Sequence, residues 1–392
     1  MYRINLPARP DWQTTLANHG LSYHSAAGAE YWKDDHCVML TQDDSDKLDN
    51  AVIAFNEMLH NTVKELVESG RIYTLLNPVL NGQLVSHMVT EFKTMGLNDD
   101  QYGRFDFAFD KAGVVRMFEY NADTPVTLIE SAYAQWEWFM DRCKEGHLND
   151  ERFFQNNYIY DHLLEMFAQY KGRTMMVICK SEQVSSYLEY EATALYLTEV
   201  AKESGVKAFF RFVDDMDLDP FNMEVIDPEF GKPDFIFKLY PTEWLVKDLE
   251  NEKCDDPIQL FRANNFIERP WKLLLGGKFM LPELYRIYGD KYGIIPAWHT
   301  REECMDKKVV AKPYYGRIGD VEILDPGQLT TMTEPVIYQE FIDLPTYGDD
   351  NVKVTIGTFM IQGKPSGFGI RQQVADVTND TCWFAPHVVE CD

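Results

Sequence analysis

The chain has 392 residues, enough for two or three domains with substantial cores, and its 45% hydrophobic and 26% charged residues are typical of a globular protein in water. Its net charge of −26 argues against nucleic-acid binding, which needs a positive surface, and favours a cationic partner or a merely acidic surface. No apolar run approaches a membrane span and the start lacks signal-peptide anatomy, so we expect a cytoplasmic protein without a membrane partner.

The seven cysteines are scattered along the chain and form no C-x-x-C pair. This pattern indicates reduced thiols and gives no support to a disulfide framework or a zinc site. A Cys–His nucleophile has no local sequence signature here either.

A long amphipathic helix is the first element that we predict. Thr41 or Asp43 can cap its start, apolar residues recur at spacings of three and four between positions 48 and 66, and Gly70 ends it. A second helix is expected from about Asn81 to Met95.

A β-hairpin should follow, with strands at Arg104–Phe109 and Val114–Tyr120 around the turn-prone residues 110–113. Past the hairpin, Pro125 stands where a helix can begin, and residues 127–143 have the pattern of a helix that packs on the sheet. The aromatic residues of that helix are expected in the core.

The hairpin carries polar side chains that strand alternation places on shared faces, Arg104 with Asp106 and Glu119 with Asn121. Two carboxylates and a carboxamide suit Mg²⁺, an ion that keeps several waters and bridges substrate phosphates. The plainer alternative is a surface hairpin whose polar residues point outward, with Arg104 paired to Asp106 or Glu119.

From Lys171 onward, the pattern changes to alternating strands and helices. Strands are expected at Thr174–Cys179, Ala208–Phe212 and Pro233–Lys238, with a helix at Tyr187–Ser204 between the first two. This order predicts a small α/β unit with a partly parallel sheet. No G-x-G-x-x-G follows the first strand, so the dinucleotide-binding fingerprint is absent.

Glu189 and Glu191, at the start of that helix, are candidates to receive a cationic group of a substrate. They are explained at least as well as acidic residues that favour a helix N-terminus. The acidic balance of the chain suits a polyamine acceptor, and it would also suit many other partners.

The last third of the chain begins with a region, residues 262–288, that is helical in pattern and holds Lys278 directly after two glycines. A set of strands should follow it: Val309–Lys312, Val321–Leu324, Val336–Phe341, Lys353–Gln362 and Pro365–Gln372.

A lysine that ends a strand, followed by a glycine-containing loop and a return strand, is a phosphate-covering arrangement. Lys312 would supply a point charge, while Gly316 and Gly319 let backbone N–H groups approach the phosphates closely. Lys278 offers a second cation upstream. The backbone of the Y-Q-E-F strand could meet an adenine edge.

Several motifs together resemble the ATP-grasp ligases, and among them the synthetase domain of the glutathionylspermidine synthetase family. The motifs are R-F-D-F, E-Y-N-A-D-T, Gly-Gly-Lys before F-M-L-P, K-P-x-x-G-R, Y-Q-E and a closing G-I-R. The resemblance covers essentially the whole chain. It implies a mixed α/β (α+β) ATP-grasp fold with antiparallel sheets and an accompanying small α/β pre-ATP-grasp domain.

We expect three regions on this basis. Residues 1–165 would form an N-terminal α+β region with the metal-ligand hairpin, residues 166–260 the small α/β domain, and residues 261–392 the part with the ATP-binding lysines, covering loop and closing strands. The ATP-grasp unit would be discontinuous and would combine the first and last regions.

The resemblance implies an ATP-dependent ligase that phosphorylates the glycine carboxylate of glutathione and joins the acyl group to a spermidine amine, with release of ADP and phosphate. Carried over by position, the Mg²⁺ ligands would be Asp106, Glu119 and Asn121. Lys278 and Lys312 would hold the phosphates of ATP.

The resemblance also places Gln339 and Glu340 near the adenine and ribose. Arg104 and Arg371 would face the transferring phosphoryl group, whose charge spreads over oxygens that fixed cations and a metal ion stabilise. Arg317, in the covering loop, would clamp a substrate carboxylate with paired hydrogen bonds.

The sequence departs from the pattern of the bifunctional members in three respects, one of which is the T-P after E-Y-N-A-D, a form that resembles stand-alone relatives. Bifunctional members carry an N-terminal amidase domain for which this chain has no room, so we expect no hydrolysis of the conjugate. Bifunctional members also have two hydroxyl residues, spaced by one, after E-Y-N-A-D. Thr124 fits the first as a substrate-binding residue, but Val126 replaces the second.

Other interpretations stay open beside the leading one. The chain could be a ligase for a different peptide and amine, or a catalytically inactive protein that binds ATP or a polyamine. It could also be an unrelated metal-dependent hydrolase in which Asp106 and Glu119 activate a water molecule.

Overall fold

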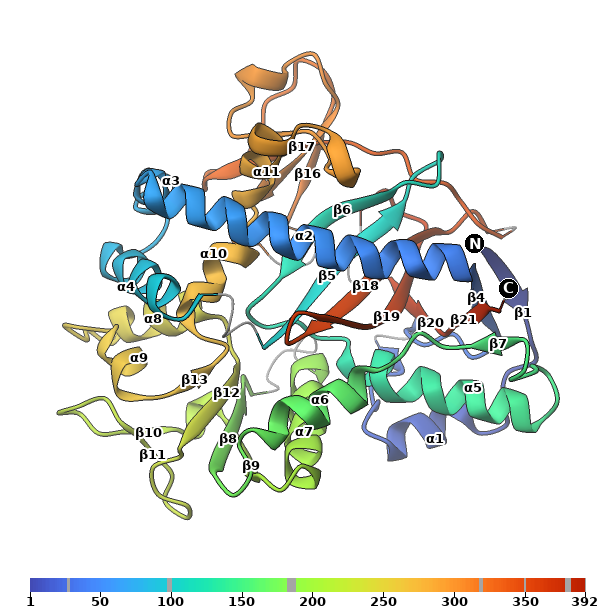
Figure 1. Ribbon diagram of the computed structural model, residues 1–392, viewed down its shortest axis with the longest axis horizontal. Coiled ribbons are helices and arrows are strands. Elements are labelled where there is room, and N and C mark those ends of the chain that lie inside the picture. The colour runs from blue at the N-terminus through green and yellow to red at the C-terminus, as the bar shows by residue number, and fades with distance from the viewer. Residues whose placement is uncertain are drawn as a thin grey trace.

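The protein is seen here in a computed structural model. The structure describes residues 1–26, 29–96, 101–181, 188–316, 320–348, 350–377 and 382–391. These residues form a mixed α/β fold in which several sheets are arranged beside one long helix (Figure 1). In the described ranges, no helix combines the length and the apolar character needed to cross a lipid bilayer.

The central sheet has five antiparallel strands in the order β20-β19-β18-β5-β6. They are β5 (Tyr102–Phe109), β6 (Val115–Asn121), β18 (Lys353–Ile361), β19 (Lys364–Gln373) and β20 (Trp383–Ala385). The expected hairpin is therefore present as β5 and β6, and β18 from the far end of the chain pairs with β5. The first and last expected regions thus share one sheet, while the domain boundaries remain a prediction.

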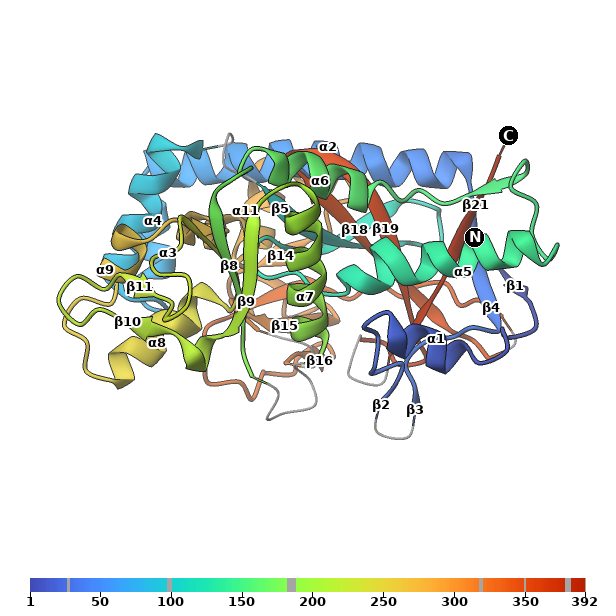
Figure 2. The same cartoon turned by 90° about the horizontal axis from the view of Figure 1, so that it is seen from below.

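Helix α2 (Gln42–Glu68) packs across one face of this sheet, as Figures 1 and 2 both show. A capping box fixes its start: Thr41 Oγ1 accepts from Asp44 N–H at 3.1 Å, and the Asp44 carboxylate accepts from Thr41 N–H at 3.3 Å. Gly70 follows its end with φ of +74°. The predicted helix and its cap are confirmed, and α3 (Arg71–Leu76) and the expected α4 (Gly82–Thr94) continue the chain.

The small sheet has the order β13-β12-β8-β9, and all three of its strand pairs are parallel, where we expected a partly parallel sheet. Its strands are β8 (Thr174–Cys179), β9 (Lys207–Phe212), β12 (Phe235–Leu239) and β13 (Phe266–Ile267). The helices beside it are α6 (Ile159–Ala168), α7 (Leu188–Glu203), α8 (Thr242–Asn251) and α9 (Gln259–Ala263).

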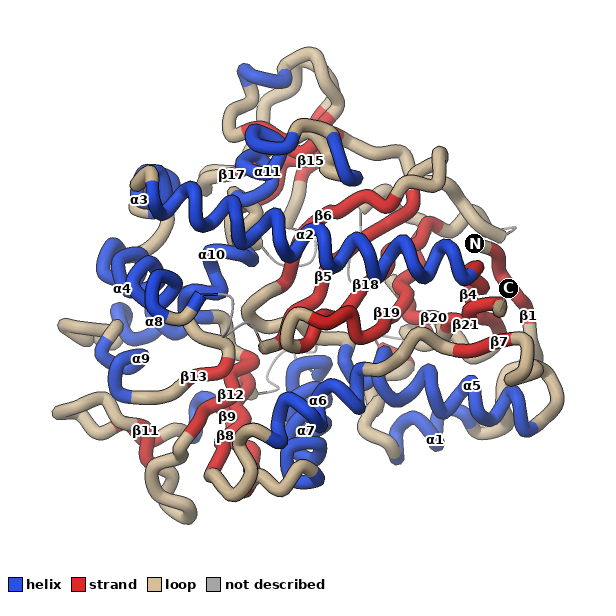
Figure 3. The backbone as a smooth tube through the Cα atoms, viewed as in Figure 1, coloured by secondary structure: helices blue, strands red, loops and turns tan. Residues whose placement is uncertain are grey.

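Both faces of the small sheet are buried, which is the usual condition of a parallel sheet. Along β8, Met175 and Val177 join the core with α6 and α7, whereas Met176 and Ile178 join the core that includes α8. Figure 3 shows α6 and α7 grouped on one side of these strands. Because successive side chains of a strand point to opposite faces, one strand can pack against helices on both sides of the sheet.

The expectation of a continuous helix over residues 262–288 is wrong in part. The region contains strand β13, a 3₁₀ turn at Pro270–Lys272, α10 (Leu273–Gly276) and α11 (Met280–Tyr288). Proline cannot donate a helical hydrogen bond, and the paired glycines before Lys278 have low helix propensity, so the helical pattern is interrupted.

The remaining sheets complete the fold. Three of the expected late strands, β15 (Val309–Pro313), β16 (Glu322–Leu324) and β17 (Val336–Glu340), form a sheet in the order β14-β17-β15-β16 with β14 (Ala297–Trp298), which was not predicted. An unpredicted mixed sheet joins both ends of the chain: β1 (Tyr2–Asn5), β4 (His36–Thr41), β7 (Phe153–Phe154) and β21 (His387–Glu390). Smaller elements are α1 (Trp12–Asn18), β2 (Ser25–Ala26), β3 (Ala29–Glu30), α5 (Gln135–Lys144), β10 (Asp217–Leu218) and β11 (Val225–Ile226).

Close packing of the hairpin strands requires a glycine at position 103. A Cβ atom there would lie 2.6 Å from Tyr120 Cζ, and the Tyr120 ring is buried and stacked on Phe105 at 4.0 Å. We therefore predict that Gly103→Ala lowers the free energy of unfolding by about 1–3 kcal/mol through overpacking, as measured by chemical denaturation. In a Tyr120→Leu background the same substitution should cost less than about 1 kcal/mol, and an undiminished cost would contradict this explanation.

Candidate active site

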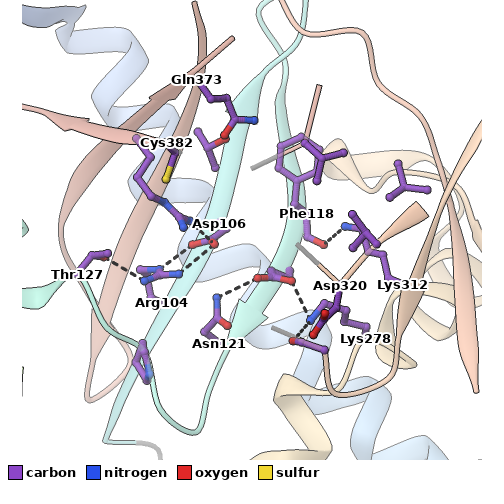
Figure 4. Close-up of a pocket in the computed structure, with 18 of the residues that line it drawn as sticks. Arg104, Asp106, Phe118, Asn121, Thr127, Lys278, Lys312, Asp320, Gln373 and Cys382 are labelled. Carbon is purple, nitrogen blue, oxygen red and sulfur yellow. Dashed lines mark hydrogen bonds and ion pairs between the residues drawn. The ribbon is translucent and has the colours of Figure 1, made fainter. Parts of the chain in front are cut away.

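One cavity of about 470 Å³ collects residues from both ends of the chain. This volume is typical of small-molecule sites, which span roughly 300–1,000 Å³. Its walls come from β5, β6, β18 and β19 of the central sheet, from β15 and β17, and from the start of α7. Figure 4 shows Arg104 and Asp106 on one side of the site and Lys278 and Lys312 on the other.

Most of the candidate residues line this cavity: Arg104, Asp106, Glu119, Asn121, Thr124, Glu189, Lys278, Lys312, Gly316, Gln339, Glu340 and Arg371. Glu191 does not line it, so the expected pairing of Glu189 and Glu191 as one cation site is not supported. The physical reason is the helical period, because residues two apart on a helix do not face the same side. Arg317 and Gly319 lie outside the described residues.

The β5–β6 register brings the oxygen ligands together. Arg104 lies opposite Asn121 and Asp106 lies opposite Glu119, while the pairing passes over Phe118, which forms a β-bulge. Lys312 Nζ donates to the carbonyl oxygen of Phe118 at 3.3 Å. The bulge therefore offers a backbone acceptor to the lysine of the neighbouring sheet.

Asp106 is held between two buried arginines. Its Oδ1 accepts from Arg104 Nε at 2.7 Å, and its Oδ2 accepts from Arg104 Nη2 at 3.1 Å and from Arg371 Nη2 at 2.6 Å. Burial acts to lower the pKa of Arg371, but the charge of Asp106, its hydrogen bond and the nearby Cys382 and Tyr31 together raise it. The Arg371 guanidinium thus stays charged in the wall of the cavity.

The two candidate lysines are held by the opposite side of the hairpin. Lys278 Nζ lies 3.1 Å from Glu119 Oε2 and donates to the carbonyl oxygen of Gly316 at 3.0 Å. Lys312 Nζ donates to Gln339 Oε1 at 2.6 Å. Gln339 therefore orients Lys312 in this structure, and this contact was not part of the prediction that placed Gln339 near the adenine.

Burial and charge shift the pKa values of this group in opposite directions. Burial alone would raise the pKa of Glu119, but Lys278 and Lys312 lower it to about 2. Burial lowers the pKa of Lys312 to about 8, even though the charge of Glu119 opposes that shift. At neutral pH, Glu119 is ionised and Lys312 is mostly protonated.

Thr127 is a lining residue that our sequence reasoning missed. Its hydroxyl accepts from Arg104 Nη1 at 3.0 Å, and the carbonyl oxygen of Val126 accepts from the same nitrogen at 2.6 Å. Thr127 has φ of +66°, a left-handed conformation that is uncommon for a β-branched residue and is found mainly at functional sites. A hydroxyl is therefore present one position after Val126.

Asp123, the aspartate of E-Y-N-A-D, was also missed. Its carboxylate accepts from the buried Lys238 Nζ, from Thr242 N–H at 3.0 Å and from Thr242 Oγ1 at 3.3 Å. These contacts join the exit of β6 to β12 and to the start of α8. The motif pointed to this residue, but its partners lie more than 110 positions away and no local signal identifies them.

The donor set at the hairpin fits Mg²⁺ bound together with phosphates. Asp106, Glu119 and Asn121 supply oxygen atoms from two carboxylates and one carboxamide, the kind of partial set that leaves positions for waters and phosphate oxygens. Among the residues that the structure describes, no group of three or more histidine, cysteine, aspartate or glutamate side chains could hold a metal ion.

The chain is similar in sequence to two ligases of known name. The chain is 28% identical over 406 residues to a Haemophilus influenzae protein assigned as an acid–amine ligase, with 97% of both chains covered. It is 27% identical over 312 residues to the trypanothione synthetase of Crithidia fasciculata, covering 72% of this chain and 46% of that one. The chain thus aligns with about half the length of the trypanothione synthetase.

A solved structure from Methylobacillus flagellatus, assigned as a γ-glutamylcysteine synthetase, shares 12% identity with a TM-score of 0.40, covering 85% of this chain and 86% of that one. The family described as glutathionylspermidine synthase preATP-grasp matches residues 3–390. This match agrees with the mixed α/β fold and antiparallel sheets seen here. The chain therefore belongs to the glutathionylspermidine synthase preATP-grasp family, and with it to the C–N ligases.

Proposed function

We propose that this protein uses ATP and Mg²⁺ to activate the carboxylate of a peptide as an acyl phosphate and joins it to an amine. Glutathione, or a similar peptide, is the proposed acid, and spermidine, or another polyamine, is the proposed acceptor. The observation that carries the proposal is that the oxygen-rich hairpin and the late lysines, some two hundred positions apart, line the same cavity. The cytoplasmic location expected from the sequence stays a prediction.

The lysines and glycines of the late region would bind the triphosphate. Lys278 and Lys312 are fixed by Gly316 and Gln339, so their ammonium groups are oriented before a nucleotide arrives. Glu340 also lines the cavity and is proposed to lie near the ribose. In this proposal Gly319 and Arg317 belong to the covering loop, and Arg317 clamps a substrate carboxylate.

The arginines of the central sheet would stabilise the transferring phosphoryl group. Arg104 and Arg371 both contact Asp106, so two fixed cations stand beside a proposed metal ligand. Bound Mg²⁺ would neutralise charge on the phosphate oxygens and orient them, held by Asp106, Glu119 and Asn121. Thr124 is proposed to contact the peptide, and Glu189 the amine.

The proposal predicts that purified protein with ATP and Mg²⁺ releases ADP and phosphate only when both an acid and an amine are present. A coupled ADP assay with glutathione and spermidine, and then with a panel of other peptides and amines, would measure this. Phosphate release without an amine would favour the hydrolase interpretation. ATP binding with no ADP release for any pair in the panel would favour a catalytically inactive binding protein.

Lys312→Ala should weaken the binding of a non-hydrolysable ATP analogue by about 10–100-fold, because it removes one charge-assisted contact. Glu119 keeps Lys278 as its partner, so the fold should tolerate the change. Isothermal titration calorimetry would measure the affinity. Lys364→Ala removes an exposed lysine paired with Glu165 and serves as the control, and equal affinities for both variants would argue against a phosphate contact by Lys312.

Arg371→Ala should keep nucleotide affinity within about threefold and lower kcat by about 10²–10³-fold, since it removes a cation needed mainly in the transition state. Asp106 retains both contacts to Arg104, so the carboxylate is not left unpaired. Steady-state kinetics together with calorimetry would separate the two effects. Unchanged turnover in this variant would contradict the role proposed for Arg371.

A further inference from the structure

A second cluster of ionisable side chains lies near Arg104 and Arg371, and no role in ATP binding is proposed for it. Its members are Tyr23, Tyr31, Glu130 and Glu189. Glu130 is completely buried in the π-helical turn Glu130–Ala134, and π turns are frequent at functional sites. Its Oε1 accepts from the hydroxyl of Tyr23 at 2.8 Å and from that of Tyr31 at 2.7 Å. Its Oε2 has no hydrogen-bond partner among the described residues.

Glu189 brings a second carboxylate to this cluster from the first turn of α7. Glu189 and Tyr31 line the cavity, whereas Glu130 stands behind them. Burial and the charge of Glu130 raise the pKa of Glu189 to about 7, while Arg371 and Arg104 oppose that shift. Burial likewise raises the pKa of Glu130, against the hydrogen bonds from Tyr31 and Tyr23 and the charge of Arg104.

The carboxyl pair takes up or releases a proton near pH 7, where the raised pKa of Glu189 lies. Two carboxylates that interact this strongly do not both ionise easily, and their titration belongs to the pair. Tyr31 lies between them, because its hydroxyl donates its one proton to Glu130 and the same hydroxyl group also interacts with Glu189. Cys382 is a further titratable group that acts on both Tyr31 and Arg371.

Amide formation from an acyl phosphate needs a proton acceptor. An alkyl amine has a pKa of about 10, so it enters the site as an ammonium ion without a free electron pair. A general base works best when its own pKa lies near the working pH. Among the cavity-lining carboxyl groups whose pKa shifts are resolved in the described residues, Glu189 has a pKa raised toward neutrality and Glu119 has one lowered far below it.

We propose that Glu189 is the general base of amide formation and that Tyr31 and Glu130 are positioning residues that relay the proton inward. This inference rests on the proposed ligase function. One ammonium proton moves to Glu189, and the electron pair so freed forms the C–N bond with the acyl carbon. The bond from that carbon to the phosphate oxygen then breaks with its electrons on phosphate, which takes up the second proton lost by nitrogen.

A comparison of two acceptors tests the role of Glu189. Spermidine is protonated at neutral pH, whereas hydroxylamine is largely uncharged and traps an acyl phosphate as a hydroxamate without a base. With full-length protein, ATP, Mg²⁺ and glutathione, or the acid found active in the panel, Glu189→Gln should lower kcat for spermidine by about 10²–10³-fold. Hydroxamate formation should fall by less than about tenfold, since only the base is lost.

An equal loss with both acceptors would overturn the proposal, because it would give Glu189 a purely structural role. Absence of both hydroxamate and ADP in the unmodified protein would instead count against the ligase function itself. Glu199→Gln, an exposed substitution on the same helix, is the matched control and should leave both rates unchanged.

The pH profile tests the relay separately. The spermidine rate should rise with pH through about 7 as Glu189 loses its proton. Glu130→Gln removes the charge that raises this pKa, so the acidic limb of the profile should move to lower pH. A limb that stays in place in Glu130→Gln would overturn the coupling of the two carboxyl groups.

Discussion

The sharing of Asp106 between Arg104 and Arg371 is the interaction on which the rest of the site depends. It joins β5 to β19 across the intervening β18, so it holds only in one register of the central sheet. A shifted register would separate Arg371 from Asp106 and leave a buried guanidinium without its carboxylate, and such a loss typically costs about 3–5 kcal/mol. The contacts of Asp106 therefore do two things: they disfavour a shifted register of the sheet, and they hold Arg104 and Arg371 at the wall of the cavity.

Pre-organised charge is the second consequence of this arrangement. Lys278, Lys312, Arg104 and Arg371 all donate to acceptors of the protein itself, so these four cations at the cavity are already oriented. Groups fixed in advance need little reorganisation when charge develops during phosphoryl transfer. The bulge at Phe118 contributes to this order, since it presents a backbone carbonyl to Lys312.

Much of this architecture could be predicted because its signals are local. The cap at Thr41, the hairpin around residues 110–113 and strand β8 each depend on residues close in sequence, and each is confirmed. The mixed sheet of both chain ends escaped prediction because β21 pairs with β4 across about 350 positions. Glu191 does not line the cavity beside Glu189, because residues two apart on a helix do not face the same side.

The sequence motifs predicted which residues lie at the candidate site, but they did not predict which of these residues contact each other. Motifs named most of the residues that line the cavity, yet they gave no sign that Gln339 contacts Lys312. Thr127 and Glu130 were missed because a left-handed threonine and a π-helical turn have no recognisable pattern of their own.

Glu119 and Glu189 line the same cavity, but their surroundings shift the pKa values of their carboxyl groups in opposite directions. Glu119 faces two lysines, which outweigh burial and lower its pKa to about 2, so it remains a carboxylate suited to a metal ligand. Glu189 faces Glu130, and burial with that like charge raises its pKa to about 7, where a proton can be taken up and released. Separated pKa values of this kind are the usual sign of a divided acid–base assignment. The sequence shows only glutamates, because the charges that distinguish them come from other parts of the chain.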